Sequence, residues 1–402
     1  MTIAEPIVRI AARGDGVTES GRHVAGGVPG DCVRDDGSLK RGPHHVAPPC
    51  RHFAKCGGCQ LQHADEETLA QFVTDRVVLA AEGQGIVPQN VAPAHLSPPG
   101  ARRRATLHAT RRGKTILLGY REGRSHTIID LKECPVLQPT LFALVDPLRK
   151  LLAGWEGRVA VDIELTQVDQ GVACGIKGIR AENLQQTEAL LDFARENALA
   201  RLTVDDGLGP ETVWEPEPST VSLGGVPVVF PPGAFLQATE DGQATLVAAA
   251  SEWLAGHSPV ADLFAGLGTF ALSLAGPEKV LAAEASRGAH LACRQAARLS
   301  GKPVFAQHRD LFHNPYSAEE ISKLAAVLLD PPRAGAREQV EQIAQSSVGR
   351  VVYISCNPAS WAKDAKRLVD AGFELKEVRP VGQFRWSTHV ELASLFVRPS
   401  GA

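Results

Sequence analysis

Two short motifs in the second half of the chain combine side chains that could do chemistry. Asp330-Pro331-Pro332-Arg333 supplies a carboxylate and a guanidinium, and Ser355-Cys356-Asn357-Pro358 supplies a thiol. Each motif follows an apolar run with the character of a buried strand, at residues 324–329 and 350–355. A thiol becomes a nucleophile where its surroundings favour the thiolate. The spacing therefore predicts that a thiol, a carboxylate and an arginine face one crevice.

The elements around these motifs predict an open, doubly wound α/β sheet. From about residue 235 onward, helices and short apolar strands alternate regularly, as they do in parallel sheets. In such sheets ligands bind in the crevice outside the carboxyl ends of the strands. We therefore expect Asp330 and Cys356 at the ligand-binding edge.

A glycine-rich turn indicates a bound nucleotide-like cofactor. Residues 259–264 read as a strand, and Gly266-Leu267-Gly268-Thr269-Phe270-Ala271 turns into a helix. The pattern G-x-G-x-x-A fits a dinucleotide or S-adenosylmethionine, and Glu284 after the next strand could bind ribose hydroxyls in either case. Three features favour the methyl donor. The turn lies far from the N-terminus, Asp310 follows the third strand where it could meet an adenine edge, and Asp330-Pro331-Pro332 follows the fourth.

Four cysteines have spacing typical of a metal site. Cys50, Cys56 and Cys59 form C-x5-C-x2-C, and Cys134 lies far downstream. Four thiolates suit either tetrahedral zinc or a cubane iron–sulfur cluster. Spacing alone leaves zinc, iron–sulfur and no metal open. The chain has eight cysteines and no small secreted scaffold around them, which favours reduced thiols over disulfides.

Length, composition and net charge limit the number of domains and the kinds of partner that the chain can have. The chain has 402 residues, 44% of them hydrophobic, and a formal net charge of -3. The length allows two or three cores, and the charge requires that any nucleic acid meet a local basic patch. One candidate patch lies between Ala101 and His126, where seven arginines and Lys114 stand against Glu122 alone. It could bind RNA or be a solvated hairpin. No apolar run is long enough to span a membrane and the start lacks a signal peptide, so we expect a cytoplasmic protein.

Breaks in the pattern divide the chain into three expected units. Residues 1–45 read as a small all-β unit rich in glycine turns. Its order of short strands and glycines resembles a TRAM domain, a small RNA-binding β-barrel. Residues 46–234 read as a mixed α/β unit, and residues 235–402 follow a break at Pro231-Pro232-Gly233.

The motifs together resemble those of the RNA uridine-C5 methyltransferases. The resemblance is most specific at Leu329 to Arg333, at Ser355 to Pro358, at His389-Val390-Glu391 and at the cysteines. It implies a Rossmann-like class I methyltransferase domain, S-adenosylmethionine as methyl donor, and a [4Fe-4S] cluster on Cys50, Cys56, Cys59 and Cys134. A TRAM-like start together with a cluster resembles the branch that acts on 23S ribosomal RNA more than the transfer-RNA branch. No membrane and no obligatory protein partner are expected.

The resemblance also implies roles for single residues. Cys356 would add to C6 of uracil, C5 would take the methyl group, and Glu391 would remove the C5 proton so that the thiol can leave. The residues expected to bind the cofactor are Gln237, Phe264, Gly266, Gly268, Thr269, Glu284, Asp310 and Asp330. Two positions depart from the family pattern. Thr269 stands where asparagine is usual, and Gly382-Gln383-Phe384-Arg385 stands where Asp-x-Phe-Pro is usual.

Other functions fit parts of the sequence. A transfer-RNA uridine-C5 methyltransferase would share every chemical motif. An amino-group methyltransferase also places a D/N-P-P motif at this strand end but would not need Cys356. A non-catalytic RNA-binding protein could keep the fold, and an NAD-dependent oxidoreductase could use the glycine turn.

Overall fold

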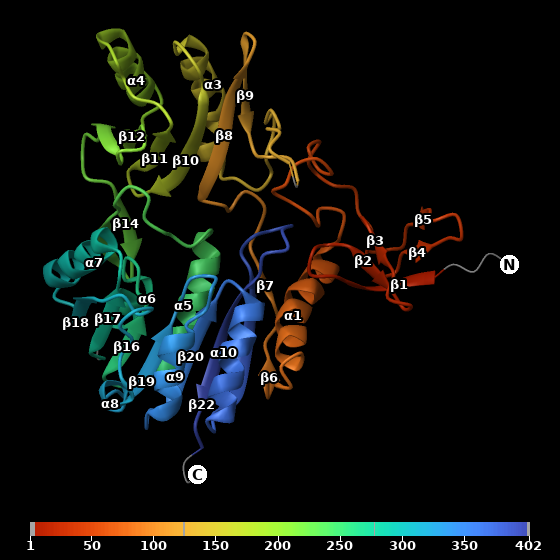
Figure 1. The fold of residues 1–402 in the computed structure, drawn as a ribbon, viewed down its shortest axis with the longest axis vertical. Helices are drawn as coiled ribbons and strands as arrows, with labels where there is room; N and C mark the ends of the chain where they lie inside the picture. The colour runs from red at the N-terminus through yellow and green to blue at the C-terminus, as the bar shows by residue number, and fades with distance from the viewer. Residues whose placement is uncertain (1–4, 124, 277, 400–402) are drawn as a thin grey trace.

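The computed structural model describes residues 5–123, 125–276 and 278–399, and in these residues the strands form four sheets. Figure 1 shows three bodies, with the N-terminal strands on one side, a central sheet at the top and a large sheet below. Side chains of all three bodies line one cavity where the bodies join.

The N-terminal sheet is small and antiparallel. Its order is β3-β2-β1-β4-β5, from β1 (Glu5–Ile10), β2 (Gly16–Thr18), β3 (His23–Val24), β4 (Cys32–Val33) and β5 (Leu39–Lys40). Glycine is required where its segments cross, because a Cβ on Gly16 would lie 2.7 Å from the carbonyl oxygen of Gly27. This close approach lets such short strands share an apolar centre at Ile7 and Val28, which are 2% and 0% exposed.

The central sheet has one covered face and one open face. Its order is β13-β12-β11-β10-β8-β9, with β8 (Arg104–Arg112), β9 (Thr115–Gly119), β10 (Ala160–Val168), β11 (Gly171–Lys177), β12 (Arg201–Asp205) and β13 (Glu211–Trp214). Alternate residues such as Leu107 and Ile163 pack against α3 (Val145–Gly154) and α4 (Leu184–Glu196). Thr106 and Thr166 point the opposite way, into a cavity. A separate short helix, α2 (Pro139–Ala143), precedes α3.

The large sheet confirms the expected doubly wound α/β architecture. Its order is β18-β17-β16-β19-β20-β22-β21-β6, from β16 (Val260–Leu263), β17 (Val280–Glu284), β18 (Val304–His308), β19 (Ala326–Leu329), β20 (Arg350–Ser355), β21 (Glu374–Gly382) and β22 (Glu391–Val397). The strands from β16 to β20 are parallel, and β22 runs antiparallel to β20. Every residue of β16 and β19 is buried, as expected for strands covered on both faces.

Helices cover both faces of this sheet, as Figure 1 shows. They are α5 (Glu240–Leu254), α6 (Thr269–Leu274), α7 (Arg287–Ser300), α8 (Ala318–Ile321), α9 (Arg337–Gln345) and α10 (Pro358–Asp370). The strand order reverses between β16 and β19, so the crevice at their carboxyl ends is a topological switch point. A hairpin of β14 (Thr220–Leu223) and β15 (Val226–Val229) connects the central and large sheets.

Segments from the first quarter of the chain complete the large sheet. β6 (Asn90–Val91) and β7 (His95–Leu96) pair in parallel with β21, and α1 (Glu66–Glu82) packs against α10 and β21. Asp65 caps α1 by accepting the N–H of Thr68 at 2.9 Å. The sheet therefore extends beyond the 235–402 unit that the sequence predicts. None of the helices in the described part of the chain has the length and apolar character needed to cross a bilayer.

Candidate active site

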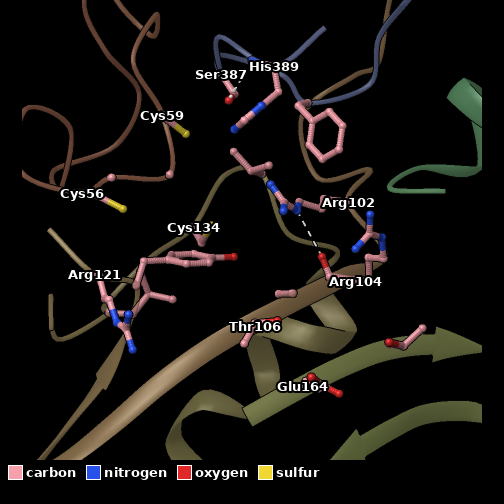
Figure 2. A pocket seen from close by; sticks show the side chains of 18 of the residues that line it. Cys56, Cys59, Arg102, Arg104, Thr106, Arg121, Cys134, Glu164, Ser387 and His389 are labelled. Carbon is pink, nitrogen blue, oxygen red and sulfur yellow. Dashed lines mark hydrogen bonds between the residues drawn. The ribbon is translucent and has the colours of Figure 1, made fainter. Parts of the chain in front are cut away.

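One cavity of about 1070 Å³ lies where the three bodies meet. Its walls include Arg13 from the N-terminal unit, the four expected ligand cysteines, the open face of the central sheet, and the C-terminal residues Arg333, Cys356, His389 and Glu391. Figure 2 shows cysteine, arginine and aromatic side chains facing this space. Residues from distant parts of the sequence therefore share a single chamber.

The thiol and two carboxylates lie at one edge of the large sheet. Asp330 follows β19 and Cys356 follows β20, its parallel neighbour. Glu391 begins β22, in which Leu392 pairs with Ser355 of β20. This register brings Glu391 beside Cys356, and both side chains line the cavity. The structure thus brings together Asp330, Cys356 and Glu391, the first and last of which are 61 positions apart in the sequence.

Burial raises the pKa of all three groups, and repulsion from neighbouring carboxylates adds to the rise for Cys356 and Glu391. Burial, then the charges of Glu391 and Asp330, raise the pKa of Cys356 to about 11, against the effect of Arg333. Burial, then Asp330, raises the pKa of Glu391 to about 8, and burial raises that of Asp330 to about 7. The site without substrate therefore holds a neutral thiol beside a carboxyl poised to change charge near neutral pH.

Cations and aromatic rings surround the thiol. Arg104 on β8 lies 4.7 Å from the ring centroid of Phe235, and Arg102 lies 5.3 Å from that of Phe384. Arg102 Nε donates to the carbonyl of Arg104 at 3.1 Å, the dashed line in Figure 2. Phe235 is 60% exposed. Exposed rings beside guanidinium groups are suitable surfaces for a nucleobase and its phosphates.

The glycine turn has the geometry of a cofactor loop. Gly266 and Gly268 have φ of 56° and 90°, and a Cβ on Gly268 would lie 2.6 Å from Cys293 Sγ. The N–H of Gly266 donates to Glu284 Oε2 at 2.9 Å. Thr269 begins α6 directly after the turn. The turn therefore presents its backbone and the carboxylate of Glu284 at the switch point.

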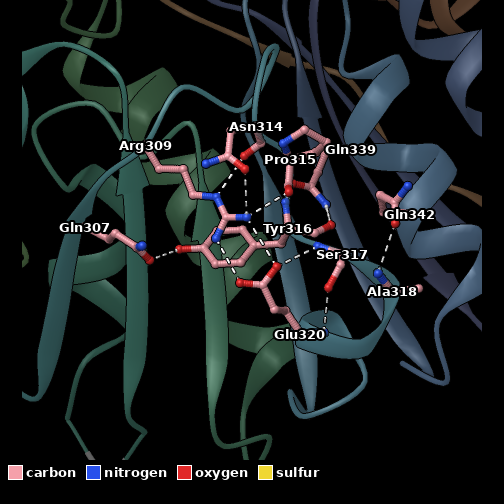
Figure 3. A network of polar contacts seen from close by, with 10 residues as sticks. All are labelled: Gln307, Arg309, Asn314, Pro315, Tyr316, Ser317, Ala318, Glu320, Gln339 and Gln342. Carbon is pink, nitrogen blue, oxygen red and sulfur yellow. Dashed lines mark hydrogen bonds and ion pairs between the residues drawn. The ribbon is translucent and has the colours of Figure 1, made fainter.

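A preformed loop carries Asp310. Its carboxylate accepts the N–H of Phe312 at 3.0 Å, and the Phe312 ring lies 5.4 Å from that of Phe264. Figure 3 shows that Arg309 anchors this loop. Its guanidinium lies 3.8 Å from the Tyr316 ring centroid and donates to Glu320 Oε1 at 2.9 Å. It also donates to the carbonyls of Asn314 and Pro315. These contacts fix the conformation of the loop that carries Asp310.

Backbone hydrogen bonds join the cysteine segment, which carries Cys50, Cys56 and Cys59, to the basic hairpin, the arginine-rich stretch that contains β8 and β9. Gly57 donates to the carbonyl of Arg121 and Gly123 donates to that of Lys55, both at 3.0 Å. Cys56, Cys59 and Cys134 face the same space in Figure 2, and Cys50 also lines it. Across residues 5–123, 125–276 and 278–399, no three Cys, His, Asp or Glu side chains converge closely enough to hold a metal ion. The thiols are therefore neighbours in one wall, without forming a closed ligand set.

Comparison with known proteins decides the family. The sequence profile described as tRNA (Uracil-5-)-methyltransferase matches residues 305–398. An uncharacterized RNA methyltransferase of Zymomonas mobilis is 50% identical over 98% of this chain and 99% of its own length. The 23S rRNA (uracil(1939)-C(5))-methyltransferase RlmD of Pectobacterium atrosepticum is 34% identical over 90% of this chain and 82% of its own.

The chain belongs to the RNA uridine-C5 methyltransferase family. A solved structure agrees in fold. The Pyrococcus abyssi tRNA (uracil-54, C5)-methyltransferase in complex with S-adenosyl-L-homocysteine has a TM-score of 0.75 and 22% identity, over 98% of this chain and 100% of that one. The large sheet of this RNA uridine-C5 methyltransferase is accordingly a class I methyltransferase sheet.

The residues expected to bind the cofactor lie in two groups. Phe264, Glu284 and Asp310 lie at the β16 to β18 side of the crevice, outside the lining of the large cavity. Gln237 and Asp330 lie between this group and Cys356, and Gln237 Nε2 donates to Asp330 Oδ2 at 3.4 Å. A cofactor in the crevice would therefore reach the cavity past Gln237 and Asp330.

The expected basic patch is divided by the structure. Arg103 is buried and donates to the carbonyl of Gln237 at 3.0 Å, and Arg111 donates to the carbonyls of Leu152 and Trp155. These two arginines therefore have a structural role, because their guanidinium groups bond to main-chain carbonyls. Arg102, Arg104 and Arg121 line the cavity instead, while Arg112 and Lys114 lie exposed at the far end of the hairpin. Arg124 lies outside the described residues.

Sequence reasoning gave no role to two buried residues near the site. Asp262 is 0% exposed and accepts the N–H of Ala271 at 2.8 Å, which fixes the start of α6 behind the glycine turn. Gln383 is 1% exposed and bonds to Gln237. The available signal was a polar residue inside or directly after an apolar strand, as in Val260-Ala261-Asp262 and Val381-Gly382-Gln383.

Proposed function

We propose that this enzyme methylates C5 of a uridine in 23S ribosomal RNA, with S-adenosylmethionine as the methyl donor. The observation that carries the proposal is the placement of Cys356 beside Glu391 in a cavity lined by arginines and aromatic rings. A relative named as a 23S rRNA (uracil(1939)-C(5))-methyltransferase matches nine tenths of this chain. Its substrate class is the best guide to the RNA that this enzyme uses.

The residues divide the reaction between them. The Cys356 thiolate adds to C6 of uracil, which makes C5 an enolate carbon able to take an electrophilic methyl group. Glu391 then removes the C5 proton, and the carbon–sulfur bond breaks so that the thiolate leaves. Arg333 opposes the rise in the pKa of both Cys356 and Glu391. It therefore favours the charged forms that both steps need.

The cofactor residues fit S-adenosylmethionine in their chemistry. When bound, this cofactor supplies an electrophilic methyl group. Glu284 and Asp310 offer carboxylates for ribose hydroxyls and an adenine edge, and Phe264 offers a ring. Gly266, Gly268 and Thr269 offer close backbone approach at the start of α6, with Gln237 and Asp330 on the side toward Cys356. These assignments follow the resemblance position by position.

A [4Fe-4S] cluster is the proposed occupant of the cysteine wall. The donor set fits, because four thiols line one surface. Val136 and Leu137 donate toward Cys134, and Gly58 toward Cys56, which opposes the rise in pKa that burial causes. Such hydrogen bonds favour thiolate ligands. The four sulfurs would have to move closer together to bind a cluster.

Two further expectations belong to this proposal. The N-terminal sheet would act as a TRAM-like RNA-binding unit, since Arg13 from it lines the same cavity as Cys356. The cytoplasm is the proposed location, because all eight cysteines are free thiols in the described residues.

The function is tested by mapping 5-methyluridine in ribosomal and transfer RNA from a strain that lacks the protein. Loss of one 5-methyluridine from 23S rRNA, restored by the wild-type gene and not by Cys356→Ala, is the expected result. Loss from transfer RNA would move the enzyme to the other branch. An unchanged 5-methyluridine map, with a methylated amino group missing instead, would refute the proposal.

A further inference from the structure

His389 lines the same cavity as Cys356 and Glu391, although the mechanism above gives it no role. It stands two positions before Glu391, on the loop that leads into β22. Its ring lies edge-on to the ring of Phe384, with the two centroids 5.8 Å apart, and its backbone N–H donates to Ser387 Oγ at 3.3 Å. Figure 2 shows His389 among the side chains that face the cavity. The imidazole is therefore held at the edge of the space proposed for the target base.

The contact with Arg333 determines which ring nitrogen of His389 carries the proton. Nη2 of Arg333 lies 2.7 Å from Nδ1 of His389. A guanidinium group can only donate hydrogen bonds, so Nδ1 must accept and cannot carry a proton itself. The one N–H of the neutral imidazole is then on Nε2. Partial burial, then the charge of Arg333 and those of two more arginines, lowers the pKa of His389 and so favours the neutral ring.

Arg333 is itself fixed beside the proposed nucleophile. Its carbonyl oxygen accepts hydrogen bonds from Asn357 Nδ2 and Ser360 Oγ, each at 2.9 Å. Asn357 directly follows Cys356 and caps the start of α10 with its side chain. The charge of Arg333 also lowers the pKa of the Cys356 thiol, against the effect of burial. The start of α10 therefore holds Arg333, and through it the ring of His389, on the Cys356 side of the cavity.

The proposed reaction needs a hydrogen-bond donor at a carbonyl oxygen of uracil. As the bond between sulfur and C6 forms, the π electron pair between C5 and C6 moves onto C5 and, by conjugation, onto O4. Methyl transfer then uses this pair for the new bond at C5, and the charge leaves O4. A donor fixed in advance at this oxygen stabilises the charge while it exists and keeps its own proton.

The Nε2–H of His389 is available for this task. No residue that the structure describes accepts a hydrogen bond from it. Two other donors in the same wall are already engaged. Arg102 Nε donates to the carbonyl of Arg104, and the amide of Asn357 donates to the carbonyl of Arg333. The imidazole thus has one nitrogen bound to the protein and one N–H left for a ligand.

We propose that His389 is a further catalytic residue, whose Nε2–H donates a hydrogen bond to O4 of the target uracil while Cys356 is bound to C6. Arg333 is the positioning residue that selects this tautomer. The inference rests on the thiol addition proposed above. It divides the work among neighbours, since Cys356 attacks the base, His389 stabilises the enolate and Glu391 removes the C5 proton.

Two substitutions separate the N–H from the bulk of the ring. His389→Met fills similar space and donates no hydrogen bond, whereas His389→Gln keeps an N–H at the end of its side chain. The substrate is a 23S rRNA transcript tritiated at C5 of uridine, which releases tritium when the C5 hydrogen is removed. We expect kcat to fall about 100-fold in His389→Met, the usual effect of losing one such donor. His389→Gln should regain roughly tenfold or more of this loss, with the KM for S-adenosylmethionine within about twofold in both.

A transcript that contains 5-fluorouridine isolates the early steps. Fluorine at C5 cannot leave as a proton, so the methylated base stays attached to Cys356. The rate at which a covalent band appears on a denaturing gel then measures addition and methyl transfer alone. His389→Met should form this band about 100-fold more slowly than the wild type. His257→Met is the control and should keep the wild-type rate, because His257 precedes β16, at the opposite edge of the sheet from Cys356.

The tautomer can be measured without RNA. The nitrogen NMR spectrum of the free enzyme should show a neutral His389 with its proton on Nε2, and Arg333→Met should give a mixture of both tautomers. A proton on Nδ1 in the wild type would overturn the inference. So would a wild-type band rate in His389→Met, or equal losses in His389→Met and His389→Gln. If His389→Met does not fold, the tautomer and a band rate for His389→Gln within about tenfold of the wild type decide the question. Absence of any covalent band with the wild-type enzyme would instead refute the thiol addition, and with it the proposed function.

Discussion

The backbone N–H of Gln60 donates a hydrogen bond to the carbonyl oxygen of Trp386 at 2.8 Å. Leu61 donates to the same oxygen at 2.9 Å. Trp386 has a φ of 59°, an uncommon conformation for a residue with a bulky side chain. It lies on the loop between Gln383 and Glu391. The cysteine segment therefore holds the loop that leads to the proposed base in a conformation the loop would not favour alone.

Removing the Gln60 side chain should weaken this link. Gln60 Nε2 donates to the carbonyl of Gly57 at 2.8 Å, and its Oε1 accepts the N–H of Thr388 at 3.3 Å. We expect Gln60→Ala to lower kcat roughly three- to tenfold, since each hydrogen bond contributes about 1 kcal/mol, with little change in S-adenosylmethionine affinity. Gln71→Ala on the exposed face of α1 is the control. Equal losses in both variants would show that the link has no catalytic importance.

Cys356→Ala and Glu391→Gln should fail in different ways. Without the thiol, no adduct forms and methyl transfer stops, while cofactor binding persists. Without the carboxylate, methylated uridine keeps its C5 proton and the RNA stays attached to Cys356. A denaturing gel should show a slow RNA-dependent band in Glu391→Gln that disappears in the double variant. A band that survives the loss of Cys356 would mean that another residue attacks the base.

The burial of Glu391 should cost stability at alkaline pH. Its pKa of about 8 in the folded protein exceeds the ordinary 4.5. Between these values the folded protein keeps a proton that the unfolded chain has released, so the free energy of unfolding falls as pH rises. Glu391→Gln should therefore gain about 1 to 3 kcal/mol relative to the wild type between about pH 5 and about pH 9, less than the full pKa difference implies.

Urea unfolding at several pH values measures this difference. Asp262 and Asp330 also have raised pKa values, to about 8 and about 7. The effect of Asp262 is the same in wild type and variant and cancels in the comparison, whereas the repulsion between Asp330 and Glu391 is lost in the variant and is part of the measured difference. A stability difference that does not change with pH would mean that Glu391 is as well solvated in the folded protein as in the unfolded chain.

Metal analysis of the purified protein tests the proposal that Cys50, Cys56, Cys59 and Cys134 bind a [4Fe-4S] cluster. Protein purified without oxygen should contain about four irons and four labile sulfides per chain, because four thiolates hold one [4Fe-4S] cluster. Cys59→Ser should lose most of this iron. Cys174→Ser is a control, since Cys174 is buried in the core of the central sheet. Stoichiometric zinc without sulfide would replace the cluster with a zinc site.

The arginines of the basic hairpin should differ in their effect on RNA binding. Arg102 and Arg121 line the cavity, and changing both to glutamine should weaken RNA affinity and lower the salt slope by about one for each lost phosphate contact. Arg112→Gln with Lys114→Gln removes the same charge at the far hairpin end and should change little. Equal effects of the two pairs would mean that net charge, not position, governs binding.

The sequence predicts that Asp330 and Cys356 lie at one edge of the sheet, but it does not predict the hydrogen bonds between distant residues at that edge. Apolar runs before Asp330 and Cys356 have a length and composition typical of buried parallel strands, so their carboxyl ends could be placed together. No local pattern indicates that Gln383 bonds to Gln237, because the two are 146 positions apart. The separate roles of Arg103 and Arg121 depend on which side chain meets a carbonyl or a cavity. The basic run in the sequence is the same for both.

Strands β6 and β21 pair with each other although the ribosome makes them at widely separated times. Lys376 bonds to Gln89 across 287 positions. During translation the residues of β6 leave the ribosome long before their partner exists, so the methyltransferase sheet stays unfinished until nearly the whole chain is made. A fragment that starts at residue 235 would expose the edge of β21 as a template for aggregation. The catalytic sheet is therefore not a module that evolution or engineering can transplant by cutting at the apparent boundary.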